Sequence, residues 1–315
     1  MADDTMAELM LPVTGAQYLI SAGDYAAAVT ELGAGLRMLT HRGQPIITGY
    51  GPDEIPSAGA GQLLAPWPNR IDHGRYSFGG RTFQLDLTEP AHDNAIHGLT
   101  RWASWQVIEY APDTVELGLD LLGRPGYPFC LELRARYQLS AQDGLEVTVT
   151  ARNPGSNPAP YGTGAHPYLR AGTGSVDSWH LQLPAARWQP ADDRGIPVGA
   201  AADVAGSPYD FRERRPIGST SLDHAFTALA AGTDGRAWAS LTGPAAEVSL
   251  WAGPGYRWLQ VFTGDALGPD ARRRAVAIEP MTCPPNAFVT GTDLLTVGPG
   301  SGIAHSWGIR ATAFM

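Results

Sequence analysis

One carboxylate of this chain stands where acid–base chemistry could take place. Glu279 follows the apolar run from Val276 to Ile278 and precedes Pro280. Because proline cannot donate a hydrogen bond to a strand ladder, we expect Pro280 to end regular pairing and to leave Glu279 at the mouth of a strand. Partial burial there would raise the pKa of the carboxyl group and make it a better base near neutral pH.

An imidazole stands in a second segment of unusual composition. His166 lies in a glycine-rich turn bounded by proline and aromatic residues, GTGAHPY at positions 162–168. One carboxylate and one imidazole are enough for a two-proton acid–base reaction on a neutral substrate, and each positioned group typically contributes ~10²–10⁴-fold. An arbitrary glutamate at the end of a strand is more often a surface residue. The surrounding motifs must therefore show whether Glu279 is functional.

Several short motifs follow one another along the chain. They are PWPNRI (66–71), NAIHG (94–98), GAHPYL (164–169), SLDHAF (221–226), LQVFTGD (259–265) and AIEPMTCPPNAF (277–288). Each is weak alone, but in this order they resemble the aldose 1-epimerase (galactose mutarotase) family, and their wording is most similar to its bacterial branch. The resemblance runs from about Gly23 to the C-terminus.

The resemblance implies mutarotation, the interconversion of the α and β anomers of a sugar. A proton must leave the anomeric hydroxyl while another reaches the ring oxygen, and the opened ring then recloses on its other face. The family's catalytic pair carries over to Glu279 as the base and His166 as the acid. We expect Glu279 to be ionised and His166 protonated in the working form.

The resemblance also implies a set of sugar-binding residues: Asn69, Arg70, His97, Tyr168, Asp223 and Gln260. The rigid donor fork of Arg70 suits two hydroxyl groups, and Asp223 can accept from two at once. Gly98 should let the backbone beside His97 approach a ligand closely. Leu99 stands where many members have a second glycine, which leaves the local backbone shape open. Trp67, Trp102 and Trp251 are candidates for aromatic stacking on the sugar, and no one of them is singled out because most of the nine tryptophans are expected in the core.

Alternation with period two dominates the sequence and predicts an all-β protein. The run from Leu131 to Leu139 alternates, and after Asp143-Gly144 the run from Leu145 to Ala151 alternates again, which predicts a hairpin. Further hairpins are expected around Gly79-Gly80 and around positions 253–255. Only positions 57–64 suggest a short helix.

The fold expected from these patterns is a large antiparallel sandwich, and the resemblance sharpens it to the galactose mutarotase-like β super-sandwich with few short helices. No linker divides the chain, so we expect one domain over residues 10–315 after a frayed segment, residues 1–9.

Composition excludes several kinds of chemistry. The chain contains no lysine, so it cannot form a lysine Schiff base with pyridoxal phosphate or with a substrate. No nucleotide-binding loop is present, two cysteines cannot form a four-cysteine zinc site, and the spacing of His92 and His97 is not that of a metal site. We therefore expect no cofactor and no metal.

The formal net charge of -9 argues against nucleic acid as a partner and is compatible with a small neutral sugar. The N-terminus lacks the pattern of a secretory signal and no apolar run reaches ~18 residues, so a cytoplasmic protein away from membranes is expected.

Two alternatives stay open at this stage. A sugar-phosphate 1-epimerase would need additional arginine near the pocket, and Arg75, Arg101 and Arg170 are available. A non-catalytic carbohydrate-binding module would keep Arg70, His97 and Asp223 but lose the acid or the base. The sugar itself (a hexose, a sugar phosphate or a sulfosugar) and the oligomeric state also stay open.

Overall fold

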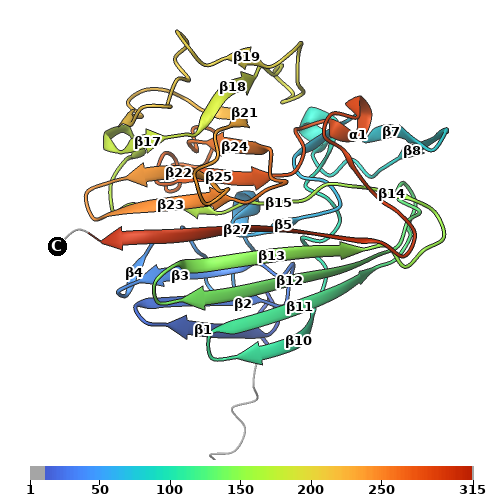
Figure 1. Cartoon of the computed structure of the whole chain (residues 1–315), viewed down its shortest axis with the longest axis horizontal. Helices are drawn as coiled ribbons and strands as arrows, with labels where there is room; N and C mark the ends of the chain where they lie inside the picture. Colours follow the sequence, from blue (N-terminus) through green and yellow to red (C-terminus); the bar gives the residue numbers. More distant parts are fainter. Residues whose placement is uncertain (1–10, 314–315) are drawn as a thin grey trace, which may run out of the picture.

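The computed structural model describes residues 11–313 and consists of stacked antiparallel sheets (Figure 1). The prediction of an all-β super-sandwich with few short helices is confirmed. The expectation for residues 1–9 lies outside the described residues.

The largest sheet has nine strands, and β27 crosses its middle between β13 and β23 (Figure 1). In spatial order its strands are β10 (Gln106–Ala111), β11 (Thr114–Leu121), β12 (Leu131–Ser140), β13 (Gly144–Arg152), β27 (Gly302–Ala313), β23 (Ala246–Ala252), β22 (Ala237–Thr242), β17 (His180–Gln182) and β20 (Arg215–Pro216).

An eight-stranded sheet carries most of the candidate site. Its strands are β19 (Ala202–Asp203), β18 (Ala185–Gln189), β21 (Asp223–Leu229), β24 (Trp258–Phe262), β25 (Val276–Met281), β15 (Gly164–Ala165) and β5 (Leu63–Leu64), with β16 (Tyr168–Leu169) also pairing with β25.

Smaller elements complete the fold. A four-stranded sheet holds β1 (Gln17–Ala22), β2 (Tyr25–Thr30), β3 (Leu36–His41) and β4 (Gln44–Pro45). The two-stranded ribbons are β6 (Arg70–Asp72) with β9 (Asn94–Ile96), β7 (Arg75–Phe78) with β8 (Arg81–Gln84), and β14 (Ala159–Tyr161) with β26 (Leu295–Val297). The helical segments are α1 (Ala287–Thr290) and the 3₁₀ turns Ser57–Gly59, Pro90–His92 and Val176–Ser178.

Alternation in the sequence produces the buried faces of these sheets. Along β12 every second side chain is buried, from Leu131 to Leu139, and the polar residues between them face outward. Buried apolar side chains of all three larger sheets belong to one hydrophobic cluster. This shared core fixes the sheets relative to one another and therefore positions the side chains at their edges.

Two of the predicted hairpins form as expected, β12 with β13 and β7 with β8. The third prediction, a hairpin around positions 253–255, is wrong. β23 pairs within the nine-stranded sheet whereas β24 pairs within the eight-stranded sheet, so this connection crosses between layers. The short helix expected at 57–64 is also wrong. Ala58 has a positive φ of 48°, which breaks the helix and leaves one 3₁₀ turn followed by β5.

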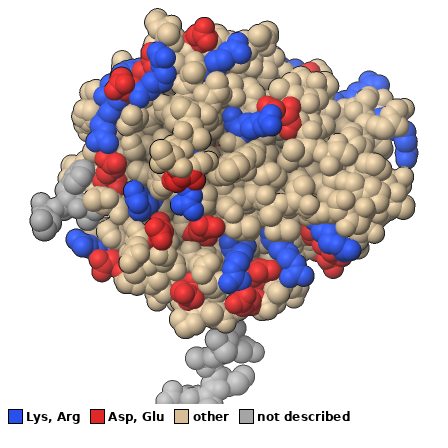
Figure 2. Space-filling model, in the orientation of Figure 1, with Lys and Arg blue, Asp and Glu red and all other residues tan. Residues whose placement is uncertain are grey.

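The surface shows no segregation of charge on the face drawn in Figure 2, where arginine and acidic side chains are interspersed. Within residues 11–313 no helix has the length and apolar character needed to cross a membrane.

Candidate functional site

Strand register brings the two predicted catalytic residues together. β15 and β16 both pair with β25, Gly164 opposite Met281 and Tyr168 opposite Ala277. The same register places His166, between β15 and β16, opposite Glu279. Their side chains meet with 3.3 Å between His166 Nε2 and Glu279 Oε1, and both are buried.

Glu279 does not lie at a strand end, as the sequence suggested, because β25 continues to Met281. Alternate amides of a strand point to the same side, and the amide of Ile278 donates to Pro167 O. The nitrogen of Pro280 therefore faces the gap between β15 and β16, where regular pairing is interrupted. The missing N–H of Pro280 is tolerated there, so the carboxylate stays inside a central strand and becomes more deeply buried than a strand end would allow.

Burial moves the pKa values of the pair in opposite directions. Desolvation, followed by repulsion from Asp223, raises the pKa of Glu279 well above its usual range, although Arg70 acts in the opposite direction. Desolvation, followed at a distance by the charge of Arg101, lowers the pKa of His166 to about 3. Both shifts favour the neutral form of each group in the free protein. The expectation of a protonated His166 concerns the working form with sugar bound and stays a prediction.

Arg70 is neutralised and held rigidly at the rim of the site. Its Nε and Nη2 donate to the two carboxylate oxygens of Glu89 at 2.8 and 2.9 Å, a bidentate pair. Its charge still reaches Glu279 and Asp223. The side-chain oxygen of Asn69 accepts from the Arg70 amide at 2.9 Å, which fixes Asn69 in a left-handed conformation (φ 53°) beside the cleft.

The hydrogen bonds around His97 identify its tautomer. Its Nδ1 accepts from the Asn69 amide at 3.2 Å, and its own amide donates to Asn69 O at 2.8 Å. Burial, followed by the nearby His166, lowers the pKa of His97 well below its usual value, so the ring is neutral and Nε2 carries the hydrogen. His97 therefore presents a donor, and its ring packs edge-on against that of His166 at 5.4 Å.

Gly98 serves the fold rather than the ligand, contrary to expectation. It has φ 71°, and a Cβ there would lie 2.0 Å from Ala65 O. The amide of Leu99 donates to the same carbonyl at 2.7 Å, and its side chain packs on the core. The close approach is thus between two backbone segments, and it fixes the position of His97.

Asp223 and Gln260 lie together on the other side of Glu279. Gln260 pairs directly with Glu279 across β24 and β25, and its Nε2 donates to Asp223 Oδ1 at 2.7 Å. Gln260 Oε1 and Glu279 Oε2 are buried without a hydrogen-bond partner. A ligand with several hydroxyl groups would satisfy both acceptors.

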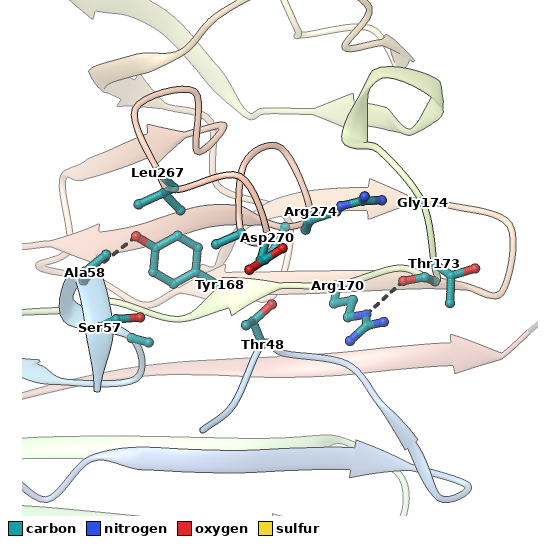
Figure 3. Close-up of a pocket in the computed structure, with 14 residues that line it drawn as sticks. Thr48, Ser57, Ala58, Tyr168, Arg170, Thr173, Gly174, Leu267, Asp270 and Arg274 are labelled. Carbon is teal, nitrogen blue, oxygen red and sulfur yellow. Dashed lines mark hydrogen bonds between the residues drawn. The ribbon is translucent and has the colours of Figure 1, made fainter. Parts of the chain in front are cut away.

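Tyr168 forms part of the wall. Its ring stacks on that of His166 at 5.0 Å, and its hydroxyl donates to Ala58 O at 3.0 Å, so its only proton is already used. Figure 3 shows Tyr168 between Ala58 and Leu267, with a second cavity of about 560 Å³ beside them. These three residues separate that cavity from the catalytic cleft.

The cleft has a volume of about 460 Å³, and all eight residues predicted from the sequence line it. Of the tryptophans considered for stacking, Trp102 lines this cleft and is half exposed, whereas Trp67 and Trp251 are buried in the core. No three His, Cys, Asp or Glu side chains gather as metal ligands within residues 11–313.

The comparisons with known proteins now add to this geometry. The sequence model of the family described as aldose 1-epimerase matches residues 16–310. The chain belongs to the aldose 1-epimerase family. Every residue that lines the cleft around Glu279 and His166 lies within the matched range.

The chain is similar to several known proteins and solved structures. The chain is 37% identical over 288 residues to an uncharacterised Escherichia coli K12 protein, YihR, covering 91% of this chain and 90% of that protein. It is 28% identical over 225 residues to the aldose 1-epimerase of the same organism, covering 66% and 64%. The crystal structure of the GalM/aldose epimerase homologue from C. elegans superposes with a TM-score of 0.85 at 18% identity, covering 95% of this chain and 99% of the other.

Two charged residues of the cleft in this family member were not among the predicted site residues. Glu89 lies before a 3₁₀ turn and pairs with Arg70, and nothing in its sequence context indicates this partner. Arg101 lines the cleft beside Trp102. From the sequence, Arg101 was considered only as one of three arginines available to bind a phosphorylated sugar.

Proposed function

We propose that this protein is an aldose 1-epimerase that interconverts the α and β anomers of a hexose or modified hexose. The observation that carries the proposal is the buried pair of Glu279 and His166, 3.3 Å apart at a cleft lined by polar side chains. A glycoside hydrolase would instead need two carboxylates across the scissile bond. Asp223 is hydrogen-bonded to Gln260 and stands outside the pair.

The reaction requires the pair to hold one proton in total. With the sugar bound, Glu279 as carboxylate takes the proton of the anomeric hydroxyl while protonated His166 gives one to the ring oxygen. The C1–O5 bond breaks and leaves an open-chain aldehyde. After rotation about C1–C2 the roles reverse, and the ring closes on the other face of the carbonyl.

The opposite pKa shifts favour this exchange. Burial raises the pKa of Glu279 and lowers that of His166, so the form with both groups neutral is favoured over the form with separated charges. Sugar hydroxyls that donate to Glu279 Oε2 stabilise the carboxylate, so binding moves the proton to His166. The total proton count does not change.

The rim fits a sugar with hydroxyl groups on several sides. Arg70 and His97 offer donors, whereas Asp223 and Gln260 offer acceptors. The half-exposed ring of Trp102 is an apolar surface for sugar C–H groups. Tyr168 contributes by positioning His166 rather than by donating to the sugar.

The test is NMR exchange spectroscopy or polarimetry of α/β equilibration across a panel of aldoses, with the spontaneous rate subtracted. Acceleration of at least one aldose by catalytic amounts of protein is expected. Binding without acceleration would instead support a carbohydrate-binding module. The proposal includes a cytoplasmic location, which cell fractionation tests.

A further inference from the structure

The second cavity, of about 560 Å³, is larger than the catalytic cleft of about 460 Å³. Both volumes are typical of sites for small ligands. Ala58, Tyr168 and Leu267 line both spaces, so the cavity and the cleft are neighbours on two sides of one wall. A ligand longer than one sugar ring therefore has room on each side of this wall.

The wall carries no bulky exposed side chain. Ala58 is exposed but ends at its Cβ, Leu267 is half-buried, and Tyr168 is only 5% exposed. Figure 3 shows Tyr168 between the other two residues, with the cavity beside them. A glycosidic linkage can cross this wall without displacing a large side chain from solvent.

The second cavity is attached to the same strand as the catalytic histidine. Arg170 directly follows β16, and its amide donates to Ile46 O at 2.9 Å. From the neighbouring segment, the amide of Thr48 donates to Tyr168 O at 2.8 Å. Because these backbone contacts fix the floor of the cavity, the space is formed before any ligand enters it.

The lining of the second cavity offers donors and acceptors to hydroxyl groups. The Nε of Arg170 donates to Gly172 O at 2.9 Å, and within residues 11–313 its Nη1 and Nη2 meet no acceptor. The carboxylate of Asp270 has no hydrogen-bond or ion-pair partner in the same part of the chain, and Figure 3 shows it directed into the space between Tyr168 and Arg170. The hydroxyl groups of Thr48 and Ser57 line the cavity as well.

These groups suit a neutral sugar ring better than an anion. A hydroxyl group accepts from Arg170 and donates to Asp270, whereas an anion beside Arg170 is repelled by the carboxylate of Asp270. Arg274 also lines the cavity, but it is exposed to solvent and directed toward Gly174, away from Asp270 (Figure 3). Small apolar side chains provide surface for the C–H groups of a sugar, namely those of Ala60, Ala271 and Ala275.

The position of the wall shows from which end of the reacting sugar a second ring extends. Tyr168 stacks on His166 with 5.0 Å between ring centroids, and His166 serves the ring oxygen in the proposed mechanism. The ring oxygen is bonded to C1 and C5, and the oxygen on C1 has to stay free to react. A substituent that crosses the wall at Tyr168 is therefore attached on the C5 side, through the C6 hydroxyl group.

We propose that the second cavity binds the second ring of a (1→6)-linked disaccharide whose reducing unit occupies the catalytic cleft. The preferred substrate is then a reducing disaccharide rather than a free monosaccharide. This inference deepens the proposed function and rests on it.

The experiment compares kcat/KM for isomaltose, kojibiose and glucose by NMR exchange spectroscopy. All three have a glucose reducing unit, and the second ring is attached at O6 in isomaltose and at O2 in kojibiose. Hydrogen bonds to charged groups predict a ~10- to 100-fold higher kcat/KM for isomaltose than for glucose, with no gain for kojibiose. Isomaltose no better than glucose, or a larger gain for kojibiose, overturns the proposal. If none of the three reacts, the same ratios of Kd from calorimetry decide.

Variants test whether the second cavity carries that preference. Asp270→Asn removes the free carboxylate and Ala271→Trp fills the cavity, and both positions are exposed, so the fold should tolerate either change. Each variant should lower kcat/KM at least ~10-fold more for isomaltose than for glucose. Asp203→Asn, at an exposed position on β19 outside both spaces, is the matched control and should leave the ratio unchanged. An equal loss on both sugars in the two cavity variants overturns the role of the cavity.

A sugar that cannot open its ring distinguishes a tethered second ring from a separate sugar molecule. Methyl α-glucopyranoside added to glucose should only compete for the cleft and slow the equilibration of glucose. If it instead accelerates that reaction, and Ala271→Trp abolishes the acceleration, the cavity holds a separate sugar and the disaccharide assignment fails.

Calorimetry separates this inference from the proposed function. If no sugar is equilibrated but isomaltose binds more tightly than glucose, and this difference is lost in Ala271→Trp, then the epimerase function fails and the second sugar site stands. If monosaccharides are equilibrated and isomaltose shows no gain in kcat/KM or in Kd, the function stands and the second sugar site fails.

Discussion

In the proposed mechanism, Glu279 and His166 gain their reactivity from burial within a sheet rather than from an exposed surface. Glu279 sits on a central strand with its Oε2 unpaired, so water does not compete for its proton. His166 is stacked against Tyr168 and shares the same desolvated space. Burial moves the pKa values of the two groups in opposite directions. A proton transfer from one group to the other leaves the net charge of the pair unchanged.

Replacing the base without changing its shape tests this arrangement most directly. Glu279→Gln should lower the catalysed rate of mutarotation at least ~10²-fold, because an amide cannot accept the anomeric proton. The half-exposed Glu132→Gln on β12, remote from the cleft, serves as the control and should match the unaltered protein. A rate for Glu279→Gln near that of the control, measured by polarimetry after subtraction of the spontaneous rate, would sink the assignment.

The two histidines of the cleft should separate in steady-state kinetics. His166→Asn should reduce kcat by ~10² or more because the acid is lost, whereas His97→Asn should chiefly raise KM, by roughly tenfold, because one donor to the sugar is lost. The opposite pattern, with kcat lost in His97→Asn and retained in His166→Asn, would show that the acid has been misassigned.

The elements around the cleft act by fixing distances between segments that are remote in the sequence. β25 receives β15 and β16 on one side and β24 on the other, which sets His166, Glu279 and Gln260 in a row. On the opposite rim of the cleft, the close approach of the Gly98 backbone to Ala65 O fixes the position of the neighbouring His97. Small backbone changes at these contacts should therefore affect both stability and binding.

Gly98→Ala should lower the free energy of unfolding by at least ~1–3 kcal/mol, the cost of a left-handed alanine, with a further penalty from the clash at Ala65 O. Gly199→Ala is the matched control, since Gly199 has φ 64° but nothing lies within 4 Å of a Cβ there. Urea denaturation measures both variants. Equal destabilisation would mean that the close approach contributes nothing.

The strands with strict alternation and the side chains in recognisable motifs could be predicted from the sequence, since both depend on local pattern. The β12–β13 hairpin follows from alternation and an Asp-Gly turn. Prediction from the sequence failed where long-range pairing between strands determines the structure. Positions 253–255 carry the turn signal of a hairpin, but the flanking strands satisfy their hydrogen bonds in different sheets.

In the candidate site, too, local features could be predicted and features that depend on tertiary packing could not. Glu279 and His166 were predicted from their motifs, but not the depth of their burial, because that depends on β15 and β16 stopping on either side of them. Glu89 carries no local signal, and its role appears only once Arg70 is placed. The direction of the His166 pKa shift could not be foreseen either, since desolvation is a property of the packed sheet.

At the scale of the whole molecule, the absence of lysine rules out a lysine Schiff base, and the proposed mechanism uses side-chain acid–base chemistry alone. We expect dialysis against EDTA to leave the mutarotation rate unchanged within experimental error. The measurement is the rate before and after dialysis, and after addition of Mg²⁺, Mn²⁺ or Zn²⁺. Loss of activity that a divalent ion restores would contradict a metal-free mechanism.

The buried carboxyl group should also leave a signature in the pH dependence of stability. Because burial raises the pKa of Glu279, the folded protein holds this proton more tightly than the unfolded chain does. That stabilisation is complete below the ordinary glutamate pKa of ~4.3 and is lost as the pH rises through the raised value. Glu279→Gln stays neutral throughout, so the variant should become more stable than the unaltered protein as the pH rises.

Glu89→Gln provides the control of opposite sign. Burial alone would raise the pKa of Glu89, but hydrogen bonds and charge from Arg70 outweigh it and bring the value to about 2. Glu89 therefore stabilises the fold above pH ~4.3, and its stabilisation is lost as the pH falls toward 2. In thermal melts at pH 7.5, Glu279→Gln should raise Tm by at least ~2 °C and Glu89→Gln should lower it. The Glu279→Gln difference should shrink toward pH 4, whereas the Glu89→Gln difference should persist to pH ~4.3 and shrink only below it. A Glu279→Gln variant that melts lower than the unaltered protein at pH 7.5 would show that this carboxyl group is paired in the fold rather than strained for catalysis.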